Sequence, residues 1–161
     1  MDADLIIRQM TQNDIEQVKQ VIDLSFPKFY RFFALRSLQE EEQVLVNEEA
    51  GKVVGFAKLI EFQVGVTKLG CLLWLAVHPK FRRKRIASAL VKAGTEFLNQ
   101  DGAKSIFASV QRRNKASLSV FRLEDFKKMG FFDLWHIFGF KVFLFYWEIW
   151  FAPGEIVLMH D

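Results

Sequence analysis

The chain has 161 residues, of which 51% are hydrophobic and 25% are charged, and this composition predicts one globular domain with a sizeable core. Its single cysteine, Cys71, excludes an internal disulfide and a cysteine-based zinc site, and with only three scattered histidines we expect no metal. The lack of disulfides favours a cytoplasmic location. No uncharged run approaches the roughly 20 residues that span a bilayer. We therefore expect no membrane span. The net charge of +3 is small for a protein that binds duplex nucleic acid, so we expect no nucleic-acid partner either.

The first part of the chain predicts a strand followed by two helices. Residues 5–9 begin as a short β-rich run. The pattern Thr11–Asp14 is close to a capping box and precedes apolar residues at helical spacing, so we expect a helix over residues 12–25. Pro27 ends this helix, and a second helix rich in aromatic residues is expected over residues 29–39.

Three strands are predicted next. Residues 44–46 and 53–62 flank a glycine-containing turn, which is the pattern of a β-hairpin, and another turn is expected over residues 64–68. Residues 71–77 are continuously apolar, which is typical of a strand buried on both faces. The dipeptide His78-Pro79 ends this strand.

The second part of the chain predicts helices and strands in alternation. Apolar residues at helical spacing predict a helix from about residue 83 to 99, and residues 105–110 predict a strand. We expect another helix over residues 114–129, which Gly130 would close, and then strands that end with residues 155–159. The predicted order is β-α-α-β-β-β-α-β-α-β-β, a mixed α/β fold around one sheet.

The densest charge lies between the buried strand and the following helix. Residues 80–85 hold five basic side chains and no acid. The beginning of a helix presents unpaired amides and the positive end of its dipole, and both attract anions such as pyrophosphate. The position therefore favours a ligand that bears phosphate. A solvated basic loop and a nucleic-acid patch are the alternatives, and the second is the weaker because no nucleic-acid-binding motif accompanies it.

The residues around this segment resemble a known motif. Residues 75–90 are similar to the acetyl-CoA motif of the GNAT (Gcn5-related) N-acetyltransferase superfamily, a strand followed by R/Q-x-x-G-x-G/A at the start of a helix. Arg82 matches the first position of that pattern and Ala87 the last. Arg85 replaces the middle glycine. In family members this glycine lets the backbone approach the pyrophosphate. We keep the match because a right-handed helical backbone accepts arginine.

The resemblance extends over nearly the whole chain, which we interpret as one N-acetyltransferase-like domain, residues 1–161. Asn114-x-Ala116 followed by residues 126–131 resembles the family's N-x-x-A…Y-x-K-x-G-F helix, and residues 155–159 resemble its closing strand. The segment between Asn114 and Gly130 is longer than in that helix, so we predict an insertion within residues 117–140. The implied fold is a GNAT-type mixed sheet with helices on both faces.

The resemblance implies transfer of an acetyl group from acetyl-CoA to a primary amine, on a small molecule or a peptide, by direct attack. The strand before the basic loop would bind the pantetheine arm, backbone amides at the helix start would hold the pyrophosphate, and Arg82 or Lys84 would add charge. The candidate cofactor-binding residues are Leu75, Ala76, Val77, Arg82, Arg83, Lys84, Arg85, Ile86, Ala87 and Asn114.

The catalytic groups are less evident. Direct attack needs a base for the amine, a donor for the oxyanion and a proton for the leaving thiolate. The family's frequent tyrosine would lie at Phe121 or Phe126, and the strand over residues 71–77 has no carboxylate. We select Glu61 as base and Tyr146, on an expected strand, as acid. Glu124, Asp125 and Tyr30 are alternatives, and the amide of Val77 is the candidate oxyanion donor. The missing groups also support an alternative function, a non-catalytic acyl-CoA-binding or interaction module.

Aromatic residues are concentrated between Phe131 and Phe151. We expect a strand there, with one set of alternate residues in the core and Phe143, Phe145 and Trp147 facing outward. Such an outward row would form a homodimer interface or line a pocket for an apolar acceptor, and packing against the inserted segment is the third alternative.

Overall fold

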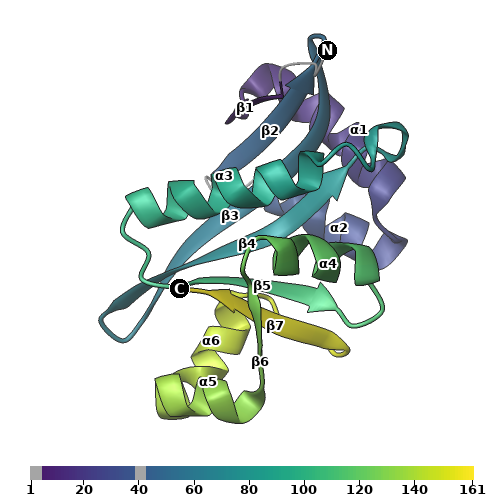
Figure 1. The fold of residues 1–161 in the computed structure, drawn as a ribbon. Coiled ribbons are helices and arrows are strands. Elements are labelled where there is room, and N and C mark those ends of the chain that lie inside the picture. The colour runs from purple at the N-terminus through teal and green to yellow at the C-terminus, as the bar shows by residue number, and fades with distance from the viewer. Residues whose placement is uncertain (1–4, 39–42) are drawn as a thin grey trace. The chain divides into compact units, whose positions relative to one another are not determined.

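The computed structural model of the protein describes residues 5–38 and 43–161 and has a mixed α/β fold (Figure 1). Seven strands hydrogen-bond in the order β1-β2-β3-β4-β5-β7-β6. Pairing is antiparallel for β1 with β2, β2 with β3, β5 with β7 and β6 with β7, and parallel for β4 with β5. The fold class predicted from the sequence is confirmed. The strands are β1 (Ile6–Gln9), β2 (Val44–Glu49), β3 (Lys52–Val64), β4 (Thr67–Val77), β5 (Ile106–Gln111), β6 (Lys127–Met129) and β7 (Glu155–His160).

The helices follow the predicted order as far as the fourth. They are α1 (Ile15–Ser25), α2 (Lys28–Ser37), α3 (Ile86–Gln100), α4 (Lys115–Leu123), α5 (Phe131–Phe138) and α6 (Val142–Glu148), with 3₁₀ turns at Gln12–Asp14, Pro79–Phe81 and Gly139–Lys141. No helix within residues 5–38 and 43–161 is long and apolar enough to cross a membrane. The same residues contain no group of three or more His, Cys, Asp or Glu side chains placed to hold a metal ion.

The chain forms two compact units. The first unit comprises the described residues up to Leu59 together with Trp74–Gly94, and the second comprises Ile60–Leu73 with Thr95–Asp161. In the first unit, α1 is amphipathic and packs its apolar face on the sheet. The buried side chains of this core are Val18, Val21, Ile22, Ala34, Val44, Val46, Val53, Phe56 and Ala76.

An ion pair fixes the beginning of α1 to the first strands. Asp14 is buried, its Oδ2 accepts from the amide of Thr11 at 2.7 Å, and its two oxygens accept from both Nη atoms of Arg8 at 2.7 and 2.9 Å. Arg8 also donates through Nε to Glu48 on β2 at 2.9 Å. The guanidinium holds the pKa of Asp14 well below its usual range. The predicted capping box is therefore present, and it also joins the helix to the sheet.

The predicted helix over residues 114–129 is wrong beyond Leu123. Asp125 adopts a positive φ of 63°, and the amides of Asp125 and Phe126 donate to the carbonyls of Arg122 and Phe121 at 3.2 and 3.0 Å. This is a Schellman ending, in which the side chain after the turn packs on the last helical turn. The rings of Phe121 and Phe126 make that contact, with centroids 5.0 Å apart. The chain then enters β6 instead of continuing as a helix.

The predicted strand in the aromatic segment is also wrong. Residues 131–148 form α5, a 3₁₀ turn and α6, so two helices separate β6 from β7. Val142, Phe145 and Ile149 are buried at helical spacing, whereas Phe143 and Trp147 are 61% and 81% exposed. Phe145, which strand alternation placed outside, is fully buried. Nearly every position here is apolar, so the pattern did not distinguish a period of two from one of 3.6.

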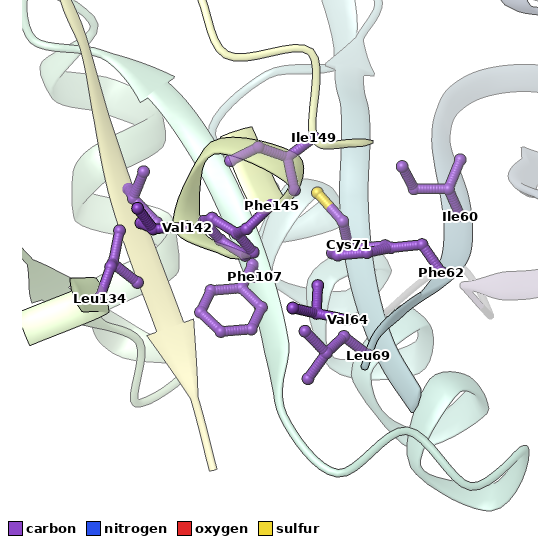
Figure 2. Close-up of a cluster of buried hydrophobic side chains, with 11 residues drawn as sticks. Ile60, Phe62, Val64, Leu69, Cys71, Phe107, Leu134, Val142, Phe145 and Ile149 are labelled. Carbon is purple, nitrogen blue, oxygen red and sulfur yellow. The ribbon is translucent and has the colours of Figure 1, made fainter. Parts of the chain in front are cut away.

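The core of the second unit is built by these two helices against the sheet (Figure 2). Phe107 of β5 and Phe145 of α6 lie at its centre with ring centroids 4.6 Å apart, and Leu134 of α5 lies beside them. Cys71 of β4 is part of the same cluster, so the single cysteine is a buried apolar residue. The helical hairpin thus covers one face of β5 and β7.

We expect Phe145→Ala to lower the free energy of unfolding by about 3–5 kcal/mol, because it removes a fully buried ring from this core. Phe32→Ala, which removes a ring that is 60% exposed on α2, is the matched control and should change it by about 0.5 kcal/mol or less. Urea unfolding measures both. The reverse order of effects would contradict the helical assignment.

Candidate functional site

At the end of β4, the amides and carbonyls of successive residues point alternately toward β3 and away from it. The carbonyl oxygen of Ala76 faces β3, since it lies 3.2 Å from the position that a Cβ on Gly55 would occupy. The amide of His78 also faces β3 and donates to the carbonyl of Val54 at 2.7 Å. Because successive residues of a strand point their amides and carbonyls to opposite edges, Val77 between them faces away from β3.

The contacts of Val77 agree with this orientation. Its carbonyl oxygen accepts hydrogen bonds from Arg82 Nε at 3.2 Å and from Ser25 Oγ, at the end of α1, at 3.5 Å. The same alternation directs the amides of Leu75 and Val77 away from β3. Both residues were selected from the sequence as candidate ligands of the pantetheine arm. Arg82 and Val77, two candidates five residues apart, are therefore brought into direct contact.

The edge of β4 to which a given amide points changes along the strand. Gly70 and His78 are eight residues apart, so in a regular strand their amides would point to the same edge. The amide of Gly70 donates to Ser105, beside β5, at 3.1 Å, whereas that of His78 donates to β3. The edge to which the amides point therefore changes between Gly70 and His78, as it does where a β-bulge adds one residue to a strand.

Glycine at position 55 lets the first turn of α3 pack closely on β3. A Cβ on Gly55 would lie 3.2 Å from Ile86 Cγ2 and 3.2 Å from Leu90 Cδ1, tighter than ordinary contacts. Ile86 and Leu90 are buried, so the first turn of α3 is held directly on β3 (Figure 1). The sequence analysis did not select Gly55. A glycine inside a predicted strand, which often marks a close approach of another element, was the available signal.

The basic loop has an unusual backbone. Arg82 is extended, whereas Arg83 and Arg85 have positive φ angles of 64° and 61°. The expectation that Arg85 would adopt a right-handed helical conformation is therefore wrong. A left-handed conformation is costly for a residue with a Cβ, and it explains why α3 begins at Ile86 rather than near residue 83. A glycine at position 85, as in the motif, would adopt the left-handed conformation without this cost because it has no Cβ.

The first amides of α3 lack partners within the helix. The bond from the amide of Ala89 to the carbonyl of Arg85, 3.0 Å long, has the i to i−4 pattern of the first helical turn. The amides of Ile86 and Ala87 precede it, and the residues four positions before them are not helical. These two amides therefore remain at the open end of the helix, where its dipole is positive.

Four cationic residues, Arg82 to Arg85, lie in the loop directly before this open end. Lys84 Nζ lies 3.2 Å from Glu49 Oε1 and 5.0 Å from the centroid of the Phe81 ring. Arg82 is tied to Val77 as described. Arg83 and Arg85 are exposed, and within residues 5–38 and 43–161 neither forms an ion pair. Two exposed arginines without an ion pair in the described part of the chain therefore directly precede the two open helix-start amides.

The remaining candidates lie in the second unit. Asn114 caps α4, since its Oδ1 accepts from the amide of Ser117 at 3.1 Å. Glu61 on β3 pairs with Lys68 Nζ at 3.0 Å, and Lys68 also approaches Asp101 at 3.4 Å. Burial, followed by a hydrogen bond with Asp101, raises the pKa of Glu61.

Tyr146 lies on α6 and not on a strand, so that part of its assignment is wrong. Its ring is parallel to that of Phe131 with centroids 6.4 Å apart, and the Phe151 ring is 4.7 Å away. Burial raises the pKa of its phenol. Across the described part of the chain, no hydrogen bond, ion pair or ring contact joins any two of Glu61, Asn114 and Tyr146.

Comparison with known proteins identifies the family. The family model described as "Acetyltransferase (GNAT) family" matches residues 10–126. The chain belongs to the GNAT acetyltransferase family. The predicted class of enzyme, an N-acetyltransferase, and the predicted acetyl donor, acetyl-CoA, are those of this family.

Individual GNAT relatives are distant in sequence but alike in fold. An N-alpha-acetyltransferase of Saccharolobus solfataricus is 25% identical over 138 residues, which cover 78% of this chain and 82% of the relative. The crystal structure of the PaiA N-acetyltransferase of Thermoplasma acidophilum, in complex with coenzyme A, has a TM-score of 0.71 at 14% identity over 98% of both chains. The ribosomal-protein-S18-alanine N-acetyltransferase of Escherichia coli has a TM-score of 0.65 at 18% identity over 96% of this chain and 90% of that one.

The left-handed backbone at Arg85 should lower the free energy of unfolding of this GNAT domain when residue 85 has a Cβ. Arg85→Gly and Arg85→Ala remove the same guanidinium, but only alanine keeps the Cβ that opposes a positive φ. We expect the glycine variant to be more stable than the alanine variant by about 1 kcal/mol. Thermal or urea unfolding of the two variants measures the difference. Equal stability would mean that Arg85 carries no backbone strain.

Proposed function

We propose that the chain binds acetyl-CoA through the start of α3 and the end of β4 and transfers the acetyl group to a primary amine. The observation that carries the proposal is the open beginning of α3, where the free amides of Ile86 and Ala87 directly follow Arg83 and Arg85, two exposed arginines that form no ion pair within residues 5–38 and 43–161. Backbone amides, a helix dipole and cations together suit a pyrophosphate. The residues present therefore fit the phosphate end of coenzyme A.

The orientation of β4 supports a role in holding the rest of the cofactor. The amides of Leu75 and Val77 point away from β3, so they are not used in that pairing and can donate to the amide groups of a pantetheine arm. Acetyl-CoA, when bound, supplies an acetyl group activated as a thioester, which a neutral amine attacks directly. The amide of Val77 is the proposed donor that stabilises negative charge on the thioester oxygen.

Glu61 and Tyr146 are the proposed proton-transfer groups. The raised pKa of Glu61 brings a carboxylate base closer to neutral pH, where general bases are most effective. The raised pKa of Tyr146 keeps its phenol protonated and able to donate. Phe121 and Phe126, where the family's tyrosine was sought, pack on each other and supply no phenol. This absence supports the second candidate, a non-catalytic acyl-CoA-binding module.

We propose a peptide amino terminus as the first acceptor to test. One GNAT relative is named an N-alpha-acetyltransferase and another acetylates the alanine of ribosomal protein S18 by its name. Release of free thiol from acetyl-CoA, measured with short peptides and with small amines, distinguishes the two functions. Thiol release that depends on an amine supports the transferase, whereas binding of coenzyme A without any turnover supports the non-catalytic module.

For the cofactor site we expect Ala87→Asp to weaken binding of coenzyme A at least roughly tenfold, about 1.4 kcal/mol, because it places a carboxylate beside the proposed pyrophosphate position. Ala93→Asp, the same change farther along α3, is the matched control and should leave the affinity within about threefold, roughly 0.7 kcal/mol. Isothermal titration measures both. An unchanged affinity in Ala87→Asp would show that the phosphates bind elsewhere.

For the catalytic groups we expect Glu61→Gln to abolish the increase of kcat with pH that deprotonation of Glu61 causes, because a base acts only when deprotonated. The raised pKa of Glu61 moves this increase toward higher pH. Tyr146→Phe should lower kcat by roughly 100-fold or more with little change in KM. Tyr30→Phe removes the phenol of the alternative candidate and serves as control. Full activity in Glu61→Gln or Tyr146→Phe would remove that residue from the mechanism.

A further inference from the structure

The outer side of the α5–α6 hairpin carries the largest exposed aromatic side chains of the second unit. We define the aromatic face as Phe132, Ile137, Phe140, Phe143, Leu144 and Trp147. Phe132, Phe140 and Trp147 expose 77%, 81% and 81% of their surface, and Phe143 exposes 61%. The other side of the same two helices holds Leu134, Val142, Phe145 and Ile149 in the core. The hairpin is therefore apolar on both sides, which is unusual for helices that face water.

The area of the aromatic face is that of a specific interface. An aromatic side chain contributes about 150–250 Å² when it is covered. At the exposed fractions of Phe132, Phe140, Phe143 and Trp147, the four rings offer roughly 600 Å². Ile137 and Leu144, exposed by 51% and 44%, bring the face close to the about 800 Å² that each partner contributes to a standard interface. Patches of this size on soluble domains mark sites of association.

The charges around the face favour a second copy over a lipid surface. Between Phe131 and Phe151 the chain has one lysine, Lys141, and one histidine against Asp133 and Glu148. Helices that lie on membranes are rich in Lys and Arg, which bind anionic lipids. This segment has one more acid than its lysine neutralises, so it lacks that attraction. Two copies of a nearly neutral face meet without strong charge repulsion, and interface cores are similarly rich in aromatic residues and poor in charge.

We propose that the aromatic face pairs with the same face of a second copy of the chain, forming a homodimer about a two-fold axis. A two-fold interface requires a surface that complements itself, and a face of exposed aromatic and aliphatic side chains meets this condition. The strand expected from the sequence led to the same kind of partner through an outward row of Phe143, Phe145 and Trp147. The structure buries Phe145 and keeps Phe143 and Trp147 on the exposed side of α6. The proposal is independent of acetyl transfer.

Light scattering on a gel-filtration column tests the proposal. The wild-type chain should have twice the monomer mass of 18.8 kDa, and Trp147→Asp should have the monomer mass. The dissociation constant of the dimer should rise at least roughly 30-fold, as for an interface hot spot. Trp147→Phe keeps an apolar ring and should remain dimeric. Phe32→Asp, which alters an exposed ring of the first unit that is 60% accessible, should also remain dimeric.

A wild-type mass of 18.8 kDa at the highest soluble concentration would overturn the proposal, as would a dimer that survives Trp147→Asp. Circular dichroism and urea unfolding of Trp147→Asp ensure that a change in mass is not caused by unfolding. Co-sedimentation with phosphatidylcholine vesicles, with and without phosphatidylserine, tests the lipid alternative. Sedimentation of a monomeric wild-type chain with either vesicle, lost in Trp147→Asp, would assign the face to a membrane instead.

Discussion

The absence of a side chain at Gly55 is the constraint on which the candidate cofactor site depends. Because no Cβ intervenes, the first turn of α3 packs directly on β3 through Ile86 and Leu90, close to the carbonyl of Ala76. This brings the open amides of a helix start next to the end of β4. Any larger residue would have to displace backbone or fully buried side chains, and interiors packed at crystal-like density accept such shifts poorly. Packing against Gly55 thus fixes the position of the end of α3 that attracts anions.

The loop between β4 and α3 combines strain with fixed contacts. Arg82 is held by the carbonyl of Val77, and Lys84 by Glu49 and the ring of Phe81, whereas Arg83 and Arg85 occupy left-handed conformations. Strained conformations persist where the surroundings determine them, and they are concentrated at functional sites. Within residues 5–38 and 43–161, neither of these two strained arginines forms an ion pair. In the proposed function their guanidinium groups bind the phosphates of the cofactor, while Arg82 and Lys84 hold the loop in shape.

The second unit shows how a segment that is apolar at almost every position folds. Leu134, Val142, Phe145 and Ile149 pack α5 and α6 on the sheet, as Figure 2 shows. Trp135, Phe138 and Tyr146 pack against the edge of that core, whereas Phe132, Phe140, Phe143 and Trp147 remain exposed. The same composition that stabilises the unit therefore creates the exposed face, and the proposed homodimer is the outcome that removes this apolar surface from water. The core and the proposed interface lie on two sides of one helical hairpin.

The sequence by itself determined the fold class, the elements from β1 to β5 and the basic loop before α3, because these have clear hydrophobic periods, caps and turn residues. It also located the cofactor candidates from Leu75 to Ala87, which are neighbours along the chain. Only the tertiary structure decided the Schellman ending at Asp125, the helices within the aromatic segment and the left-handed backbone of Arg85. An uninterrupted apolar run fits helix and strand alike, and a positive φ at a residue with a Cβ is imposed by its surroundings. The role of Gly55 was likewise decided by elements distant in sequence, because a close approach requires both partners to be placed.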